Sequence, residues 1–373
     1  MGNYRNNKKE IKLRIAEGRW QNEVKRKGMV YYEYRPKKKV DKKKTNNFIR
    51  VPTNFSIYNP DVENDFEATM KVIRQVRNII FNPDERLYID FSKTKNIKMA
   101  SLVILFSAVE KSMLQDNVYR IVFSKDNAVN NLLRLSGFVR LCRGHQVISS
   151  FENLKYLPIV SGVGGQYREE IIDFIQNEIY KNRMKPETEH TYADAVQEAI
   201  NNVSLHAYPS MEQSEKKWWM SCDLIYDQLY IAIYDEGVGI PETVMFKKWF
   251  RSTLKSKYPE IESKVLSELD SLNLSLIDKS KYRFGIVSDP IKIAISMIGD
   301  ITGTSNDKHG QGSKSIKALV QNNDTGKLWI YSNHGLYKLS NGSGEKSGEL
   351  VHELTSKISG TLIQWNIKVR YDD

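Results

Sequence analysis

After a polar N-terminal stretch, the spacing of apolar positions alternates between the period of a strand and that of a helix. The apolar run 87–91 predicts a strand, and apolar residues three to four apart predict a helix over 99–113. A second strand is predicted over 118–123, followed by a short helix through 130–135 that Gly137 ends. Repeated strand–helix units predict a sheet covered by helices, so we assign the chain to the α/β class.

A longer amphipathic helix is predicted over residues 193–208. Five apolar side chains follow the helical spacing and form a stripe facing the core: Val196, Ala199, Ile200, Val203 and Ala207. Glu198, Asn202 and His206 are each four residues apart, so they are expected to lie together on another face. Three polar groups would then line up beside whatever covers that face.

Two glycine-rich motifs follow this helix. The strands predicted over 218–224 and 228–234 lead into Asp-Glu-Gly-Val-Gly at residues 235–239. Glycine lets the backbone approach a ligand closely, and the Asp235 carboxylate can accept a hydrogen bond from an amino group. A second glycine-rich turn, residues 309–313, is predicted to open a helix whose free backbone N–H groups suit a phosphate.

The charge of the chain is concentrated at one end. The 373 residues carry a net charge of +11. Residues 1–50 contain 17 Lys and Arg against 5 Asp and Glu, a net charge of +12, which leaves −1 for residues 51–373. We therefore interpret residues 1–46 as a basic, flexible arm, with docking on nucleic acid or on an acidic partner as the alternative.

The cysteine content and the hydropathy pattern indicate the compartment. Only Cys142 and Cys222 are present, which excludes a disulfide framework and is typical of a reducing environment. No apolar run approaches the roughly 20 residues of a membrane-spanning helix. Charged residues stand where a secretory signal would be apolar. We predict a cytoplasmic protein that does not associate with membranes.

The order of elements in the N-terminal half resembles a known fold. The strand ending in Asp90, the helix entered at Ala100 and Ser101, and the later 135–138 stretch resemble a STAS domain, the anti-anti-sigma-factor fold, over residues 47–145. Signalling members of that family carry a phosphoacceptor serine where this sequence has Ala100. We interpret the neighbouring Ser101 as a residue that stabilises the helix start, with a substitute phosphoacceptor as the alternative.

The motifs of the second half, in their order along the chain, resemble the GHKL ATPase superfamily of histidine kinases, anti-sigma-factor kinases, type II topoisomerases and mismatch-repair ATPases. The match spans roughly residues 157–370. It implies a Bergerat-type ATP-binding domain, an α/β sandwich with a mixed sheet and helices on one face. We place this domain at residues 146–373, with an insertion at about 242–302 that contains two predicted helices.

The resemblance also implies roles for individual residues. Glu198 would be the base that orients an attacking water or hydroxyl, and Asn202 would bind a Mg²⁺ ion that bridges the phosphates. Asp235 would bind the adenine amino group in a pocket shaped by Gly237 and Gly239. These five residues would form the adenine pocket and the metal-binding end of an ATP site.

The remaining matching residues would lie over the phosphates or near the base. Gly310 and Gly312 would close a lid over the phosphates, and Thr361, at the entry to a final strand, would lie near the adenine. Ser313 and Lys314 stand where family members have apolar or small residues. Lys314 could add a cation to the phosphate site, with simple exposure to solvent as the alternative.

Together these expectations describe a regulatory protein that binds Mg²⁺ and ATP. It would hydrolyse ATP slowly or phosphorylate a partner protein on Ser or Thr, with the lid coupling the nucleotide state to that partner. The run 198–208 is closest to the anti-sigma-factor Ser/Thr kinase branch. A non-catalytic, ATP-dependent switch or scaffold is the main alternative, and a nucleic-acid-associated ATPase that uses the basic arm is another. A homodimer is also left open.

Overall fold

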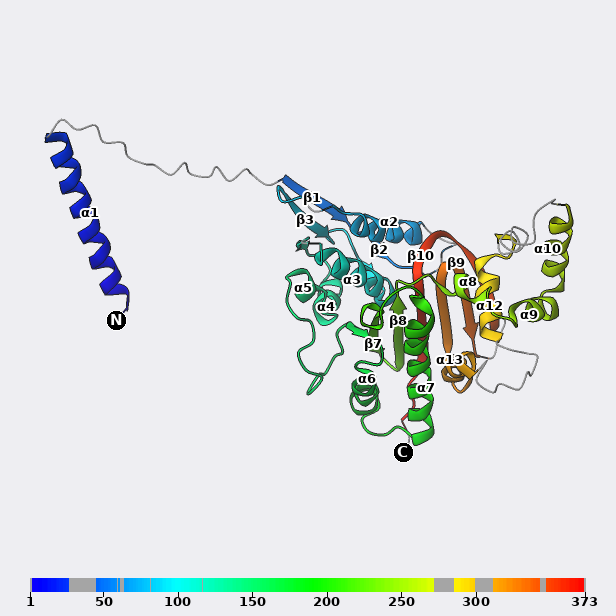
Figure 1. Cartoon of the computed structure of the whole chain (residues 1–373). Coiled ribbons are helices and arrows are strands. Elements are labelled where there is room, and N and C mark those ends of the chain that lie inside the picture. The colour runs from blue at the N-terminus through cyan, green and yellow to red at the C-terminus, as the bar shows by residue number, and fades with distance from the viewer. Residues whose placement is uncertain are drawn as a thin grey trace. The chain divides into compact units, whose positions relative to one another are not determined.

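The structure is a computed structural model of mixed α/β type with both parallel and antiparallel sheets (Figure 1). The residues that it describes are 2–26, 45–58, 60, 64–80, 82–115, 117–271, 285–298, 311–342 and 347–371. The chain divides into two units, Met1–Lys44 and Thr45–Asp373. The described part of the first unit is helix α1 (Gly2–Arg26). None of the described helices combines the length and the apolar character needed to cross a membrane.

The N-terminal part of the second unit, residues 45–142, is built around a parallel sheet. Its three strands lie in the order β1 (Thr45–Arg50), β3 (Glu85–Asp90), β5 (Tyr119–Val122). Parallel neighbours need long crossover connections. Helices α2 (Asp65–Arg77) and α3 (Met99–Met113) supply them. The smaller elements are β2 (Asn54–Phe55), β4 (Asn96–Ile97), α4 (Asn127–Leu135) and α5 (Phe138–Cys142).

The elements predicted for this part are confirmed. The strands expected over 87–91 and 118–123 are β3 and β5, and the helix expected over 99–113 is α3. The short helix that follows is α4. Gly137 ends it with a φ of +78°, in the left-handed region that glycine adopts readily, and α5 starts at the next residue.

The position that was compared with the STAS phosphoacceptor is inaccessible. Ala100 and Ser101 lie in the first turn of α3 and are 1% and 0% exposed. The hydroxyl of Ser101 is buried and has no hydrogen-bond partner among the described residues. Ser101 therefore serves neither of the roles considered for it, because it is out of reach of a phosphate donor and makes no bond that would stabilise the helix start.

The C-terminal part contains a sheet of five strands in the order β6-β7-β8-β10-β9. All four pairings are antiparallel, so the expected mixed sheet is wrong for this part of the chain. For the β7–β8 pair the reason is local: the two strands are joined by a tight turn in which Tyr226 has a φ of +58°, and a turn this short can only reverse the strand. The strands are β6 (Val160–Val163), β7 (Lys217–Ile225), β8 (Gln228–Asp235), β9 (Lys327–Ser340) and β10 (Gly348–Lys368).

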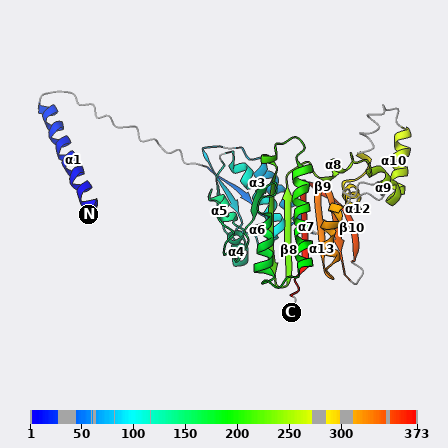
Figure 2. The ribbon, with the colours of Figure 1, turned by 60° about the horizontal axis from the view of Figure 1, so that its bottom comes forward.

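Helices cover both faces of this sheet (Figures 1 and 2). One face packs against α6 (Arg168–Phe174), α7 (Pro186–Asn202), α12 (Asp289–Ile298) and α13 (Gln311–Gln321). The other face packs against α2 and α3. Neighbouring strand residues alternate between the two cores: Trp218 lies in the first and Trp219 in the second. The resemblance predicted helices on one face only, and here the N-terminal helices cover the second.

Helix α3 therefore lies between two sheets. A helix in that position is expected to be apolar on every side, and Ala100–Val109 of α3 are all buried. Residues of the parallel sheet, of α2 and α3 and of the five-stranded sheet share one continuous core. The order across the second unit is thus parallel sheet, α2–α3, five-stranded sheet, and the layer of α6, α7, α12 and α13.

The expected insertion contains the two predicted helices. They are α10 (Pro259–Ser271) and α12, and they follow α8 (Ile240–Val244) and α9 (Phe250–Lys257). Val244, Phe250, Leu254 and Val265 form a small separate core with Val287 and Ile295. The expected start of the lid at residues 303–305 lies outside the described residues, as does Gly310.

Candidate functional site

Helix α7 carries the first group of predicted site residues. It begins with Pro186 at its first position and with Glu187 and Glu189 in its first turn, both favourable at a helix N-terminus. It ends at Asn202 and continues as a wider, π-helical turn, Val203–Ala207. The predicted apolar stripe is confirmed, because Val196, Ala199, Ile200, Val203 and Ala207 are all buried.

Glu198 and Asn202 are brought together on the half-buried side of α7. The Asn202 amide nitrogen donates a hydrogen bond of 3.1 Å to Oε1 of Glu198. Burial raises the pKa of Glu198, and the bond from Asn202 opposes that shift in part. The expected third member, His206, does not follow the α-helical spacing, because it lies in the π turn, and its side chain is exposed. Turns of this kind occur frequently at functional sites.

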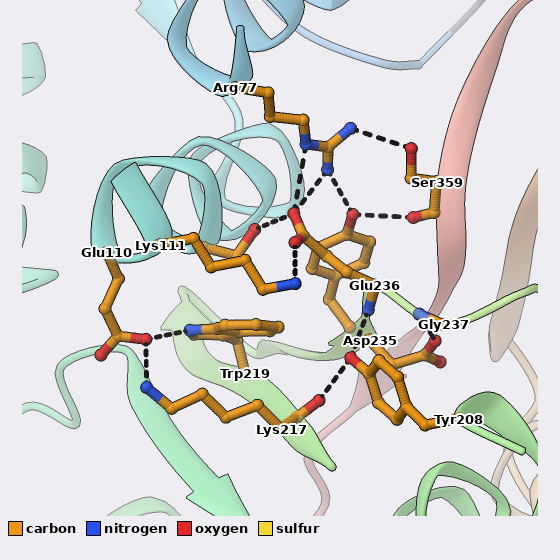
Figure 3. Close-up of polar contacts among 12 residues, drawn as sticks. Arg77, Glu110, Lys111, Tyr208, Lys217, Trp219, Asp235, Glu236, Gly237 and Ser359 are labelled. Carbon is orange, nitrogen blue, oxygen red and sulfur yellow. Dashed lines mark hydrogen bonds and ion pairs between the residues drawn. The ribbon is translucent and has the colours of Figure 1, made fainter. Parts of the chain in front are cut away.

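Asp235 is the last residue of β8, and its side chain is buried, with 5% exposed. It lies opposite Thr361 of β10, as the resemblance implied, and its Oδ1 accepts a hydrogen bond of 2.8 Å from the Gly237 backbone N–H (Figure 3). Burial raises the pKa of Asp235 to about 7, although backbone bonds from Gly237 and Thr361 oppose the shift. No cation of the described residues lies within ion-pair distance of it.

The loop after Asp235 is tied to the end of the α7 segment. The Glu236 N–H donates to the Tyr208 hydroxyl over 2.8 Å (Figure 3). The Val238 N–H donates to the Ala207 carbonyl over 2.8 Å. A Cβ on Gly237 would lie 2.1 Å from the Ala207 carbonyl oxygen. Gly237 is thus required by a close approach within the protein. Gly239 instead has a φ of +91° and directly precedes α8.

Polar residues of β9 and β10 complete this end of the site and were missed in the sequence. Ser332 accepts a hydrogen bond from the Ile240 N–H over 2.9 Å, and its Oγ lies 3.1 Å from Oγ1 of Thr361. The Asn333 side chain donates to the Val238 carbonyl over 3.2 Å, and its Oδ1 is buried without a partner among the described residues. The sequence did contain a signal for them, because the polar pair Ser332–Asn333 directly follows the apolar residues 328–331 of the same strand.

The start of α13 lies against Glu198. A Cβ on Gly312 would come within 2.0 Å of Oε1 of Glu198, so only glycine leaves room for the carboxylate in its observed position. Ser313, the next residue, is half-buried, and Lys314 is exposed. The structure thus brings Gly312 together with Glu198 and Asn202, and α13 packs along α7 (Figure 2).

The site residues gather at two points of the helical segment 198–207. At its end, Ala207 contacts the loop that joins Asp235 to Gly239, beside Thr361. Nine residues earlier, Glu198 contacts the start of α13. The rise of a helix puts roughly 13 Å between these two ends. Among the described residues, no group of three His, Cys, Asp or Glu side chains is arranged to hold a metal ion.

Comparisons with known proteins add no relative. No family model matches the sequence, and a search of curated proteins finds no match either. The order of the motifs in the chain and the arrangement of their side chains are the two features that favour a ligand site.

Proposed function

We propose that this protein binds Mg²⁺ and ATP in the manner of the GHKL ATPases, through a Bergerat-type module formed by the five-stranded sheet and its α7–α13 layer. Asp235 carries the proposal. It is a buried carboxylate that has backbone N–H partners and no ion-pair partner among the described residues, at the end of a strand beside a glycine loop. The proposal includes a STAS-like assignment for residues 47–145.

The surroundings of Asp235 suit the adenine base. A buried carboxylate that lacks a cation is stabilised by an additional hydrogen-bond donor, and an exocyclic amino group is such a donor. Thr361 pairs with Asp235, and its hydroxyl contacts Ser332. The unpartnered Oδ1 of Asn333 adds an acceptor next to Gly239. These acceptors favour a base that carries hydrogen-bond donors.

The Glu198 end suits the phosphates and the metal ion. The bond to Glu198 uses the nitrogen of the Asn202 amide, which leaves the oxygen, the atom that binds Mg²⁺, outside that bond. When bound, Mg²⁺ would neutralise part of the phosphate charge. The raised pKa of Glu198 makes its carboxylate a better proton acceptor, which a residue that orients a water or hydroxyl requires.

The phosphate acceptor would be water or a separate protein. The N-terminal part of the same chain is a poor acceptor, because position 100 is alanine and the Ser101 hydroxyl is buried. The protein would then act as a slow ATPase or as a Ser/Thr kinase of a partner protein, with cytoplasmic location as the expectation. A homodimer and a role of the basic arm in binding nucleic acid remain parts of the hypothesis.

Calorimetry with Mg²⁺ and ATP, combined with phosphate release, tests the proposal. Asn202→Ala should weaken ATP binding in the presence of Mg²⁺ but not in its absence. Glu198→Gln should retain binding and lose phosphate release. Gln197→Ala is the matched control, because Gln197 lies on the exposed side of the same helix. If Asn202→Ala binds Mg²⁺ and ATP as the unmodified protein does, the metal assignment is wrong.

Labelled γ-phosphate distinguishes the three forms of the proposal. Free phosphate indicates hydrolysis, and label on a protein encoded nearby indicates a kinase. Nucleotide that binds and stays intact indicates the ATP-dependent switch. Absence of any nucleotide binding by the full chain would remove all three.

A further inference from the structure

Glu236 follows Asp235 directly, but its side chain lies on the other face of the sheet. Strand residues alternate between faces, and Tyr234, two residues before Glu236, belongs to the core formed with α2 and α3. Both oxygens of Glu236 are bound there (Figure 3). Oε1 accepts from Arg77 of α2 over 2.7 Å and from Ser107 of α3 over 3.1 Å, and Oε2 lies 2.6 Å from Nζ of Lys111.

Glu236, Arg77, Ser107 and Lys111 form a polar cluster that is buried at its centre and ionised. The side chain of Glu236 is 7% exposed and that of Arg77 19%, whereas Lys111 is 43% exposed. Burial disfavours the charged form of Glu236, but Arg77 and Lys111 outweigh it and hold the pKa of Glu236 below its ordinary value. Removing one partner of such a pair leaves a buried charge without compensation. The three charged side chains therefore depend on one another.

The cluster also reaches both strands that carry the proposed adenine contacts. Arg77 lies 2.6 Å from the hydroxyl of Tyr234, the residue before Asp235. Arg77 also donates to the Ser359 hydroxyl over 3.2 Å, and Tyr234 donates to the Ser359 carbonyl over 2.7 Å. Ser359 stands two residues before Thr361. Residues adjacent to Asp235 and close to Thr361 in sequence are thus held by one guanidinium group (Figure 3).

A second polar contact joins α3 to the sheet and bonds directly to neither Glu236 nor Arg77. Oε2 of Glu110 accepts from Nζ of Lys217 over 2.9 Å, from the Trp219 indole over 2.8 Å and from Ser161 over 3.2 Å. These partners lie on β6 and β7. Glu110 therefore attaches the same helix to the same sheet, and it provides a matched control for Lys111.

We propose that Arg77 and Lys111 are positioning residues for the nucleotide site: by holding Glu236 they fix the loop that carries Asp235, and so couple α2 and α3 to the bound base. The part of this statement that concerns ATP rests on the proposed function. Coupling between two sites is reciprocal. A partner that binds at the partly exposed Lys111 and shifts the cluster would thus change the affinity for ATP, and ATP would change the affinity for that partner.

The first test needs no ligand. Amide hydrogen exchange, read by mass spectrometry over residues 233–241, is compared among the full-length protein and its Arg77→Met, Lys111→Met and Glu110→Gln variants. Exchange in this segment should be faster in the two cluster variants and unchanged in Glu110→Gln. Lys111→Arg keeps the charge and should behave as the unmodified protein. Equal exchange in Lys111→Met and Glu110→Gln would overturn the positioning claim.

The second test measures discrimination between bases. The dissociation constants of ATP and of purine riboside triphosphate, which lacks the amino group, are measured for the same variants. Loss of a fixed Asp235 should reduce the preference for ATP by about 5-fold or more, the lower end of typical couplings. If the cluster had only a structural role, its variants would bind both nucleotides more weakly by the same factor. The ratio of the two dissociation constants would then be unchanged.

The two tests separate failure of this inference from failure of the proposed function. If the unmodified protein binds neither nucleotide, the proposed function is wrong, and the exchange experiment still decides whether the cluster fixes the loop. If it prefers ATP and both cluster variants keep that preference, the coupling is wrong while the nucleotide site stands. Lys111 is partly exposed, so Lys111→Met decides the matter should Arg77→Met not fold.

Discussion

Two adjacent carboxylates, Asp235 and Glu236, lie on opposite faces of the five-stranded sheet, and their pKa values are shifted in opposite directions. Asp235 points to the α7 face, is buried without an ion-pair partner among the described residues, and has a pKa raised to about 7. Glu236 points to the α2–α3 face, where Arg77 and Lys111 hold its pKa below the ordinary value. A fully partnered carboxylate serves the assembly of the fold, whereas an under-partnered one marks a place where a ligand can supply the missing donor.

The comparison predicts that Glu236 contributes mainly to stability and Asp235 mainly to binding, with Glu236 affecting binding only through the loop that it fixes. Replacements that keep the shape of each side chain separate the two roles, because they remove the charge and little else.

Glu236→Gln should reduce the free energy of unfolding most. It leaves Arg77 in a mostly buried position without its carboxylate, a change that typically costs about 3 kcal/mol or more. Urea unfolding followed by circular dichroism measures the loss. Glu110→Gln is the control and should cost less, because Glu110 and Lys217 are 21% and 31% exposed in their side chains. A loss no greater than that of Glu110→Gln would contradict the assignment of Glu236 to the assembly of the fold.

Asp235→Asn should have the opposite profile. Replacing an ionised acceptor by an amide should weaken ATP binding by about 10- to 100-fold, the range expected for hydrogen bonds to charged groups. The free energy of unfolding should fall less than in Glu236→Gln, since no cation of the described residues loses a partner. Calorimetry and urea unfolding measure the two quantities. ATP binding as tight as in the unmodified protein would exclude Asp235 from the base pocket.

Gly312→Ala tests the contact between α13 and Glu198. Alanine favours helix over glycine by about 1 kcal/mol where its side chain has room, but here its Cβ would meet the Glu198 carboxylate at 2.0 Å. Overpacking typically costs about 1–3 kcal/mol, so the substitution should destabilise the protein and slow phosphate release. In a Glu198→Ala background it should instead stabilise. The same sign in both backgrounds would show that Glu198 does not restrict this position.

Local patterns were enough to predict many elements and the order of the site motifs. The bounds of α3 and the pairing of β7 with β8 follow from spacing, since both are set by residues near in sequence. The placement of Asp235 beside Thr361 could be predicted only through the family resemblance, because 126 positions separate the two along the chain. The π turn after Asn202 has no local signal in the sequence, so the change of helical spacing before His206 could not be predicted.

The second covered face of the sheet was missed, although the sequence contains a signal for it. The run Trp218-Trp219-Met220 is apolar without alternation, a pattern typical of strands buried on both faces. Glu236 was missed for another reason. Its partners Arg77 and Lys111 lie more than a hundred residues away along the chain, so only the folded structure brings these charges together.

The raised pKa of Asp235 should also make the stability of the protein depend on pH. Its folded pKa of about 7 exceeds the unfolded value of 3.8, so the folded state binds this proton more tightly. The stabilisation is complete below the unfolded pKa and is lost as the pH rises through the folded one. Asp235→Asn removes this contribution. The variant should therefore gain stability relative to the unmodified protein between pH 5 and 8, as measured by urea unfolding at each pH.

ATP binding should depend on pH in the opposite direction. The adenine amino group requires the ionised carboxylate, so binding releases the proton of Asp235, and affinity should increase with pH up to a plateau above the folded pKa. Below that pKa the change is at most about tenfold per pH unit, the limit for a single proton. In Asp235→Asn the dependence should disappear. A single buried carboxylate without a cation would therefore produce two opposite trends over one pH range: stability would fall with rising pH, and ATP affinity would rise. A paired carboxylate such as Glu236, whose pKa is lowered, would give a stability change of the reverse sign at lower pH.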